Sequence, residues 1–377
     1  MILGKKNSCA MLRDFLAVFL LCAAATACTD YRSDTTSAEQ AKVRLGQKLF
    51  MDKGLSRDRT VSCQSCHQPD RFFVDLRPRA EGSGNRVGTR NTPSLLDVGL
   101  MSSFFWDGRE NRLEAAAIQA LTNPAEMDLS GHEKALQRLR QDPTYRPFSQ
   151  GAFGTPELGI EEVALALTAY LRSLPLHPTR YDLSKATDAS KTALTQEQAA
   201  GLALFSAKAG CSACHSLEGS PAALTDNRFH HAGIGFGRVA GNINGMIELL
   251  DSSKKGGVPT GTLVLGNASV AELGRFAVTR KPADLGAFRT PSLRNVSRTA
   301  PYMHDGSVAT LADAVERELY YRGLALGRPI TLTVEEQQQL LAFLIALNAE
   351  GLPVKPNNRG RIQAASSSGV GSTSMSR

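Results

Sequence analysis

The stretches Cys63-Gln-Ser-Cys66-His67 and Cys211-Ser-Ala-Cys214-His215 decide the fold of this 377-residue chain. In each, two cysteines two residues apart are followed at once by a histidine, the pattern that attaches a c-type haem. The thiols add to the two vinyl groups on one porphyrin edge, and the adjacent imidazole ligates the iron. A zinc site would need two cysteine pairs converging on one ion, and a thioredoxin-like motif has no use for the histidine. The sequence therefore predicts two covalent haems c, attached through Cys63, Cys66, Cys211 and Cys214, with His67 and His215 as iron ligands.

The first 28 residues hold the other three cysteines, Cys9, Cys22 and Cys28. They begin with positive charge, continue with an apolar run too short to span a bilayer, and end on small residues before Cys28. Residues 1–27 are therefore expected to be a signal peptide, and the haems to be attached in the periplasm. Cys28 also fits a lipid anchor, so a lipoprotein and a soluble periplasmic protein both remain open.

The formal net charge is +7 at pH 7. The propionates of two haems would offset much of this positive charge. The sequence has no lysine and arginine run of the kind that binds nucleic acid, so the charge pattern does not indicate a nucleic-acid partner.

The chain also contains an internal repeat. Setting Thr92 against Thr290 without a gap aligns residues 93–95 with 291–293 as Pro-Ser-Leu, and residues 107–108 with 305–306 as Asp-Gly. Duplication of a one-haem unit best explains such a run. We therefore predict a mainly α fold of two cytochrome-c-like haem domains, residues 28–175 and 176–352, followed by a disordered tail, 353–377. Helical spacing of apolar residues predicts helices over 113–121, 133–140, 160–174, 196–205, 311–320 and 334–347.

The halves of the repeat differ where Trp106, the only tryptophan, stands in place of His304. Trp106 lies in a Phe-Phe-Trp-Asp-Gly-Arg segment and His304 in a Pro-Tyr-Met-His-Asp-Gly segment. With these, the haem motifs and the Arg-Asn-Thr-Pro stretch at 90–93, the chain resembles the bacterial di-haem cytochrome c peroxidase and MauG family over essentially its whole mature length.

The resemblance implies a role for each site residue. Peroxide would react at the first haem, held by His67, and the second, held by His215, would relay electrons. Trp106 would lie between the haems and carry electrons, unless it is only a core aromatic. Glu126 matches the distal carboxylate that moves a proton between the peroxide oxygens. A calcium ion would bind Asn91 and the backbone carbonyls of Thr299 and Pro301, an all-oxygen ligand set.

The chain departs from the family's pattern in two residues expected near the first haem. In many members of the family a histidine after the first motif caps this iron, but no histidine occurs between His67 and His132. The stretch 72–89 therefore cannot supply that ligand, and the iron is expected to be open, as in MauG. The family's distal glutamine is Ala116 here, with Gln119 further along the same predicted helix as a weak substitute.

A third departure concerns the sixth ligand of the second haem. The family's methionine position is Glu318, and no methionine occurs between Met303 and Met375. MauG-like proteins have a ligating tyrosine nearby, which makes Tyr320 the predicted ligand and Tyr321 the alternative. Packing of both rings at a helix end remains open. For His230 and His231 we expect packing or a propionate hydrogen bond rather than iron ligation.

Three functions remain. The first is an oxidoreductase that reduces hydrogen peroxide with electrons from a small carrier protein, a cytochrome c or a cupredoxin. The second is a MauG-like enzyme that oxidises residues of a partner protein. The third, a plain di-haem electron carrier, is disfavoured by Glu126 and the missing distal histidine. We predict the peroxidase.

Overall fold

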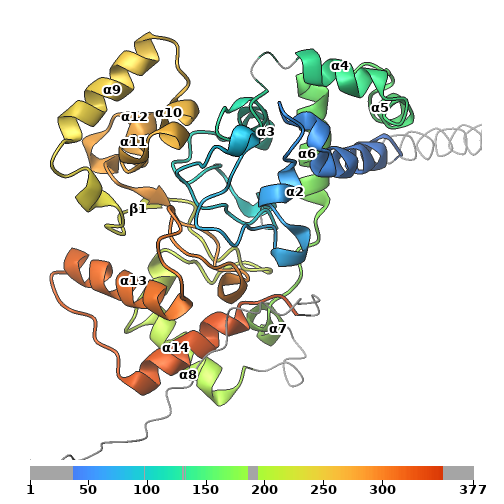
Figure 1. Cartoon of the computed structure of the whole chain (residues 1–377). Helices are drawn as coiled ribbons and strands as arrows, with labels where there is room; N and C mark the ends of the chain where they lie inside the picture. Colours follow the sequence, from blue (N-terminus) through green and yellow to red (C-terminus); the bar gives the residue numbers. More distant parts are fainter. Residues whose placement is uncertain (1–36, 97, 130, 132, 186–193, 351–377) are drawn as a thin grey trace, which may run out of the picture.

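The protein is mostly helical, with a single small sheet among the residues that the structure describes (Figure 1). This computed structural model describes all residues except 1–36, 97, 130, 132, 186–193 and 351–377. A first helix covers residues 37–51. The α-helices that follow are Cys63–Cys66 (α2), Leu113–Thr122 (α3), Glu133–Gln141 (α4), Arg146–Phe153 (α5), Ile160–Ser173 (α6), Arg180–Ser184 (α7), Gln196–Ser206 (α8), Ile243–Lys255 (α9), Thr260–Gly266 (α10), Ala268–Ala271 (α11), Phe276–Thr279 (α12), Leu311–Ala325 (α13) and Val334–Ala346 (α14).

The six helices predicted from apolar spacing are confirmed as α3, α4, α6, α8, α13 and α14. Local signals define several of their ends. Thr195 and Thr333 accept hydrogen bonds from the backbone N–H of the third residue of α8 and α14, which satisfies a donor that the helix itself leaves free. Only α13 is clearly longer than predicted, because it continues to Ala325.

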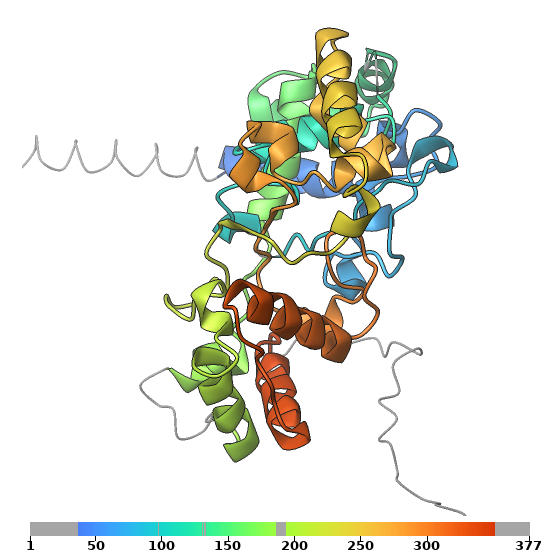
Figure 2. The same cartoon turned by 90° about the vertical axis from the view of Figure 1, so that its left-hand side faces the viewer.

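Two of the hydrophobic cores are built alike around a pair of crossing helices. In the first, Phe50 of the helix 37–51 packs on Tyr170 of α6, with ring centroids 5.4 Å apart. In the second, Phe205 of α8 packs on Phe343 of α14 at 5.1 Å. The second pair forms the lower part of the molecule together with α13 (Figure 2).

Each helix crossing is close because a glycine lies at the contact. A Cβ added at Gly201 would lie 1.9 Å from the backbone oxygen of Gln339, and one at Gly46 would lie 1.9 Å from that of Ala166. Any side chain at either position would push the two helix backbones apart. This explains the glycine that begins the Gly-x-x-Leu-Phe stretch before each haem motif, at 46–50 and at 201–205.

We predict that Gly201→Ala lowers the free energy of unfolding by about 1–3 kcal/mol, the usual cost of overpacking a core. Gly266→Ala is the control, since a Cβ there meets no atom within 4 Å. Its effect should stay below about 1 kcal/mol. The midpoints of urea unfolding, followed by circular dichroism, measure both changes. Equal midpoints for the two variants would contradict this account of the crossing.

A third hydrophobic core lies in the segment between the second haem motif and Thr290, for which the sequence predicted no helix. Helices α9 to α12 surround Leu250, Val264, Val270 and Leu273, which are fully or almost fully buried. The Thr89 hydroxyl donates to the Val264 carbonyl over 2.8 Å, which joins this core to the first half of the chain. The apolar side chains of this segment are spread over several short helices, so no long periodic pattern reveals them.

The sheet has two antiparallel strands, Phe229–His230 (β1) and Phe288–Arg289 (β2). None of the helices described is long and apolar enough to cross a membrane. The predicted signal peptide 1–27, Cys28, His132 and the predicted disordered tail 353–377 lie outside the described residues.

Candidate active site

The first haem motif presents its histidine with one nitrogen already occupied. Cys63 and Cys66 lie at the two ends of α2, and His67 follows. His67 Nδ1 donates to the Phe73 carbonyl over 3.1 Å. Burial lowers the pKa of His67, which favours the neutral ring. A neutral imidazole that donates from Nδ1 keeps a lone pair on Nε2, the arrangement expected of an iron ligand.

The second motif repeats this arrangement. His215 Nδ1 donates to the Leu224 carbonyl over 3.0 Å, and burial lowers the pKa of His215 as well. A serine supports each loop, because Ser94 Oγ donates to Phe72 O over 2.7 Å and Ser292 Oγ donates to Ala223 O over 2.9 Å. The Thr-Pro-Ser stretches matched in the sequence repeat therefore support the corresponding loop, the one that accepts the histidine's hydrogen bond, in both halves.

A cavity of about 510 Å³ adjoins the second motif and is lined by Cys211, Cys214 and His215. Its wall is largely apolar and includes Leu293, Leu319, Leu340 and Leu344. The Nε atom of Arg322, which also lines it, is buried without a hydrogen-bond partner. An apolar cavity with two thiols, an oriented imidazole and an unsatisfied guanidinium donor suits a haem with its acidic propionates.

Glu126 lies beside the first motif. Burial raises the pKa of the Cys63 and Cys66 thiols to about 12, and the nearby Glu126 carboxyl contributes to both shifts. Glu126 Oε2 is itself buried and has no hydrogen-bond partner. Burial raises the pKa of Glu126 to about 7, although the positive charge of Arg109 opposes the shift. A buried, unpaired carboxyl that titrates near neutrality is suited to proton transfer.

Arg109 is a site residue to which the sequence analysis gave no role. Its guanidinium stacks 3.5 Å over the Phe105 ring, pairs with Asp107 at 2.9 Å, and keeps a buried Nη2 without a partner. Gln119 Oε1 accepts from Arg109 Nε over 2.9 Å, so Gln119 supports Arg109 and does not replace Ala116 as a free amide. The internal repeat could have identified Arg109, because the two halves differ at this position: Arg109 aligns with Ser307 of the second half.

Trp106 connects the two halves of the chain. Its Nε1 donates to the Asn91 carbonyl over 2.9 Å, and the Asn91 N–H donates to the His304 carbonyl over 2.9 Å. Its own carbonyl accepts from the N–H of Arg289 over 2.8 Å. Trp106 also lines the cavity of the second motif. Trp106 and His304, which correspond in the repeat, are thus bridged by Asn91.

The three residues predicted to bind calcium line one cavity, and their binding of calcium stays a prediction. Asn91, Thr299 and Pro301 all line the cavity described above, at the junction of the two halves. The Asn91 amide nitrogen donates to the Pro78 carbonyl over 3.2 Å, which orients the side chain and leaves its Oδ1 out of this bond.

Helix α13 distinguishes the two candidate tyrosines. The face that lines the cavity carries residues about one turn apart, among them Leu311, Val315, Glu318 and Tyr321. Tyr320 lies off this face and is 62% exposed. The predicted iron ligation by Tyr320 does not fit this geometry, because helical periodicity turns its side chain towards solvent; the alternative, Tyr321, is on the cavity side.

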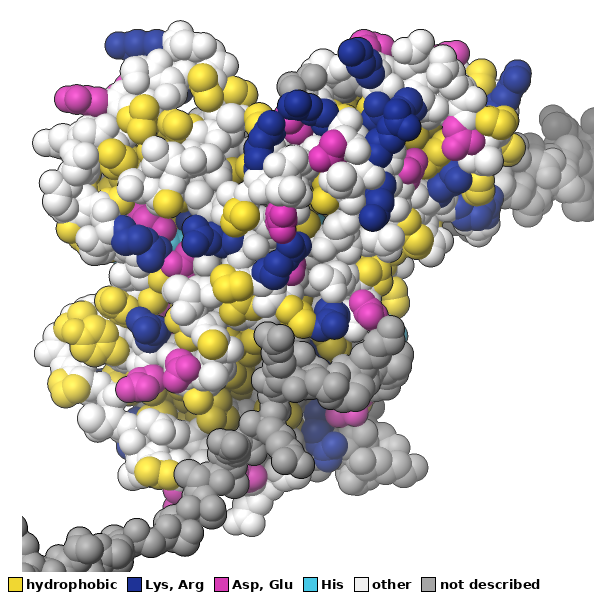
Figure 3. Space-filling model, in the orientation of Figure 1, with side chains coloured by type: hydrophobic (Ala, Val, Ile, Leu, Met, Phe, Trp, Pro, Cys, Tyr) yellow, Lys and Arg dark blue, Asp and Glu magenta, His cyan; other side chains and the backbone are white. Residues whose placement is uncertain are grey.

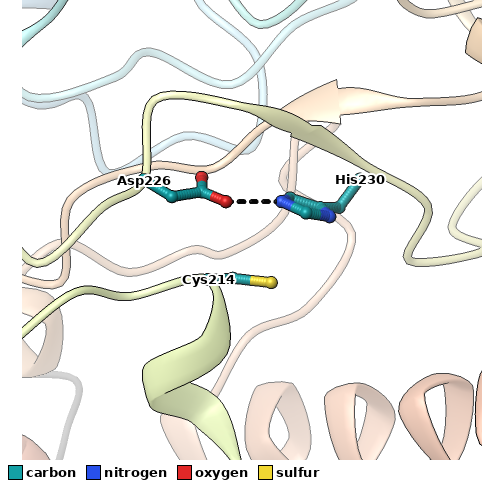
Figure 4. Close-up of side chains that lie close together, drawn as sticks. All are labelled: Cys214, Asp226 and His230. Atoms are coloured by element: carbon teal, nitrogen blue, oxygen red, sulfur yellow. Dashed lines mark hydrogen bonds and ion pairs between the residues drawn. The ribbon is translucent and has the colours of Figure 1, made fainter.

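His230 and His231 also line this cavity, and a hydrogen bond holds His230. Figure 4 shows His230 facing Asp226, with Cys214 beside the pair. The Nε2 atom of His230 and Oδ2 of Asp226 are 2.7 Å apart. This hydrogen bond uses Nε2 of His230, the ring nitrogen that His67 and His215 keep free for iron. The expectation that His230 is not an iron ligand stays a prediction.

Comparison with known proteins identifies the family. A family model described as di-haem cytochrome c peroxidase matches residues 40–190. Over 317 residues the chain is 34% identical to the methylamine utilization protein MauG of Methylorubrum extorquens, covering 82% of this chain and 78% of that protein. It is 32% identical to the cytochrome c551 peroxidase of Pseudomonas aeruginosa, covering 85% and 82%. A solved MauG-like protein associated with microbial copper homeostasis has a TM-score of 0.66 and 29% identity, covering 82% and 90%. The chain therefore belongs to the di-haem cytochrome c peroxidase and MauG family of oxidoreductases.

Proposed function

We propose that this protein reduces hydrogen peroxide to water in the periplasm, with electrons from a small carrier protein, a cytochrome c or a cupredoxin. The observation that carries the proposal is the buried, unpaired Oε2 of Glu126 beside the first haem motif. A plain electron carrier has no use for such a group, whereas peroxide cleavage needs a proton to move between two oxygens.

A haem bound by His67 supplies the redox chemistry that cleaves the O–O bond. Glu126 takes a proton from one peroxide oxygen at Oε2 and returns it to the other oxygen, which leaves as water. The positive charge of Arg109 limits the rise of the Glu126 pKa, so that the basic form of this carboxyl is available near neutral pH. The Oε2 atom that carries this proton is buried in the protein.

Trp106 is proposed to carry electrons between the haem sites, because its bonds to Asn91 and Arg289 place its indole at the junction of the two halves. Trp106→Phe should leave the peroxide reaction nearly unchanged and slow electron sharing between the haems. Rapid-mixing absorbance would then show the first haem oxidised while the second stays unoxidised. If electrons pass between the haems of this variant at the wild-type rate, Trp106 only packs at the junction and does not carry electrons.

For the sixth ligand of the second haem we propose Tyr321, since it lies on the cavity face of α13. A phenolate stabilises ferric iron, so Tyr321→Phe should raise the reduction potential and change the spectrum of the second haem alone. Tyr320→Phe is the matched control and should leave the spectrum and potential unchanged. If neither variant alters that haem, Glu318 is the next candidate to replace.

Calcium is proposed at Asn91, Thr299 and Pro301, where an oxygen-binding cation would fix the two halves relative to each other.

We further propose that the two haem domains arose by duplication. The support is the paired bonds of His67 and His215 to loop carbonyls and the paired helix crossings at Gly46 and Gly201.

The alternative is a MauG-like enzyme that oxidises residues of a partner protein, which the tyrosine in place of a methionine favours. The two functions share the peroxide step and differ in the source of the electrons. A steady-state assay with peroxide and reduced cytochrome c tests the proposal. Sustained peroxide-dependent oxidation of the cytochrome supports the peroxidase, and haem oxidation by peroxide without cytochrome turnover supports the alternative.

A further inference from the structure

Tyr320 and Tyr321 form an aromatic pair that leads from the cavity of the second haem to the surface. Their ring centroids are 5.2 Å apart in an edge-to-face arrangement, with an interplanar angle of 80°. Tyr321 lines the cavity together with His215, and Tyr320 is 62% exposed. One ring thus faces the haem site while the ring in contact with it faces solvent.

The inner ring is held firmly in place. A Cβ added at Gly233 would lie 2.0 Å from Cε1 of Tyr321, so the ring lies directly against the backbone of this glycine. Gly233 has a φ of +63°, a conformation that glycine adopts without strain. The loop after the second haem motif and helix α13 therefore fix Tyr321 between them.

Tyr320 is distinctive among the oxidisable aromatic side chains that the structure describes. Tyr145, Tyr170 and Tyr181 are buried, Tyr302 is largely enclosed, and Trp106 is half-buried at the junction of the halves. Figure 3 shows hydrophobic side chains gathered over the end of α13, where Leu324 and Leu326 are 60% and 51% exposed. An external electron donor can therefore reach Tyr320 across an accessible apolar surface.

We infer that Tyr321 and Tyr320 form a relay through which external donors deliver electrons, one at a time, to the second haem site. This inference rests on the proposed peroxidase function. In each step an electron leaves the Tyr320 phenol through Tyr321 towards the cavity, and the phenol proton passes to water. A one-electron donor, together with a proton, then restores the phenol. Two such steps supply the two electrons with which hydrogen peroxide and two protons become two molecules of water.

The test is to trap the tyrosine radical in the haem-loaded protein. Peroxide is added without a donor but with the nitrone spin trap DMPO, and the adducts are located by peptide mass spectrometry. We expect a peroxide-dependent adduct on Tyr320. Tyr321→Phe should reduce this adduct to the level found without peroxide, although Tyr320 is still present. Tyr170→Phe removes a buried tyrosine outside both the pair and the cavity and should leave the adduct unchanged.

The haem absorbance of the same samples separates the possible failures. A spectrum that does not respond to peroxide overturns the proposed function and the relay with it. A normal response without an adduct on Tyr320 overturns the relay alone, as does full labelling of Tyr320 in Tyr321→Phe. A second measurement uses Tyr320→Phe, an exposed change that should not disturb folding. This variant should react with peroxide normally and oxidise reduced cytochrome c more slowly, and an unchanged rate would contradict the relay.

Discussion

Glu126→Gln is expected to slow peroxide cleavage by about 10²-fold or more, the usual contribution of a positioned acid or base. The amide keeps the size of the side chain but cannot accept a proton at Oε2. Peroxide should therefore still enter the site, and only the later step should slow. Stopped-flow absorbance at the first haem, over a range of peroxide concentrations, separates binding from cleavage.

The pH dependence gives this prediction a second readout. Because burial raises the pKa of Glu126 to about 7, the carboxylate that acts as base is lost as the pH falls through this value. The cleavage rate should rise with pH up to about 7 and fall about tenfold for each pH unit below it. In Glu126→Gln this limb of the profile should disappear.

Glu114→Gln is the matched control. Glu114 is also a largely buried carboxyl in the first half of the chain, but it is paired with Arg172 at 2.6 Å. Its replacement should leave the cleavage rate close to that of the wild type, with unchanged haem content. If both variants react at the same rate, Glu126 is not the base, and Arg109 with its unpaired Nη2 becomes the residue to replace.

The fully oxidised protein is expected to react with peroxide at once, without prior reduction. The loop 72–89 lies against the Glu126 segment, since Ser83 N–H donates to the Glu126 carbonyl over 2.7 Å and Arg86 donates to that of Pro124 over 2.7 Å. This loop contains no histidine, methionine, cysteine or lysine to cap the iron. The loop thus lies beside the site and has no strong ligand to offer it.

Two measurements check this prediction. The resting spectrum should contain one high-spin haem, and mixing with peroxide should change it without a lag. Reduction by one electron beforehand should give no large increase in rate. Two low-spin haems in the resting protein, with activity that appears only after half-reduction, would show that another residue caps the iron.

The part of the site that depends on short sequence patterns was predicted directly. The Cys-x-x-Cys-His motifs specify covalent chemistry among five consecutive residues, and the apolar spacing of α8 or α14 depends only on helix geometry. The repeat also predicted which segments correspond, and the corresponding hydrogen bonds of His67 and His215 to loop carbonyls agree with it.

Other features depend on packing between distant segments, and only the tertiary structure decided them. The sequence placed two tyrosines side by side but could not show which one faces the cavity, because that depends on how α13 is rotated against its neighbours. It matched Glu126 to a family position, whereas the shift of its pKa depends on burial and on Arg109. The third core of α9 to α12 likewise forms only when several short helices meet. Covalent motifs and helical period are local properties of a chain, while burial, electrostatic surroundings and the orientation of a helix face are set by contacts between residues far apart in sequence.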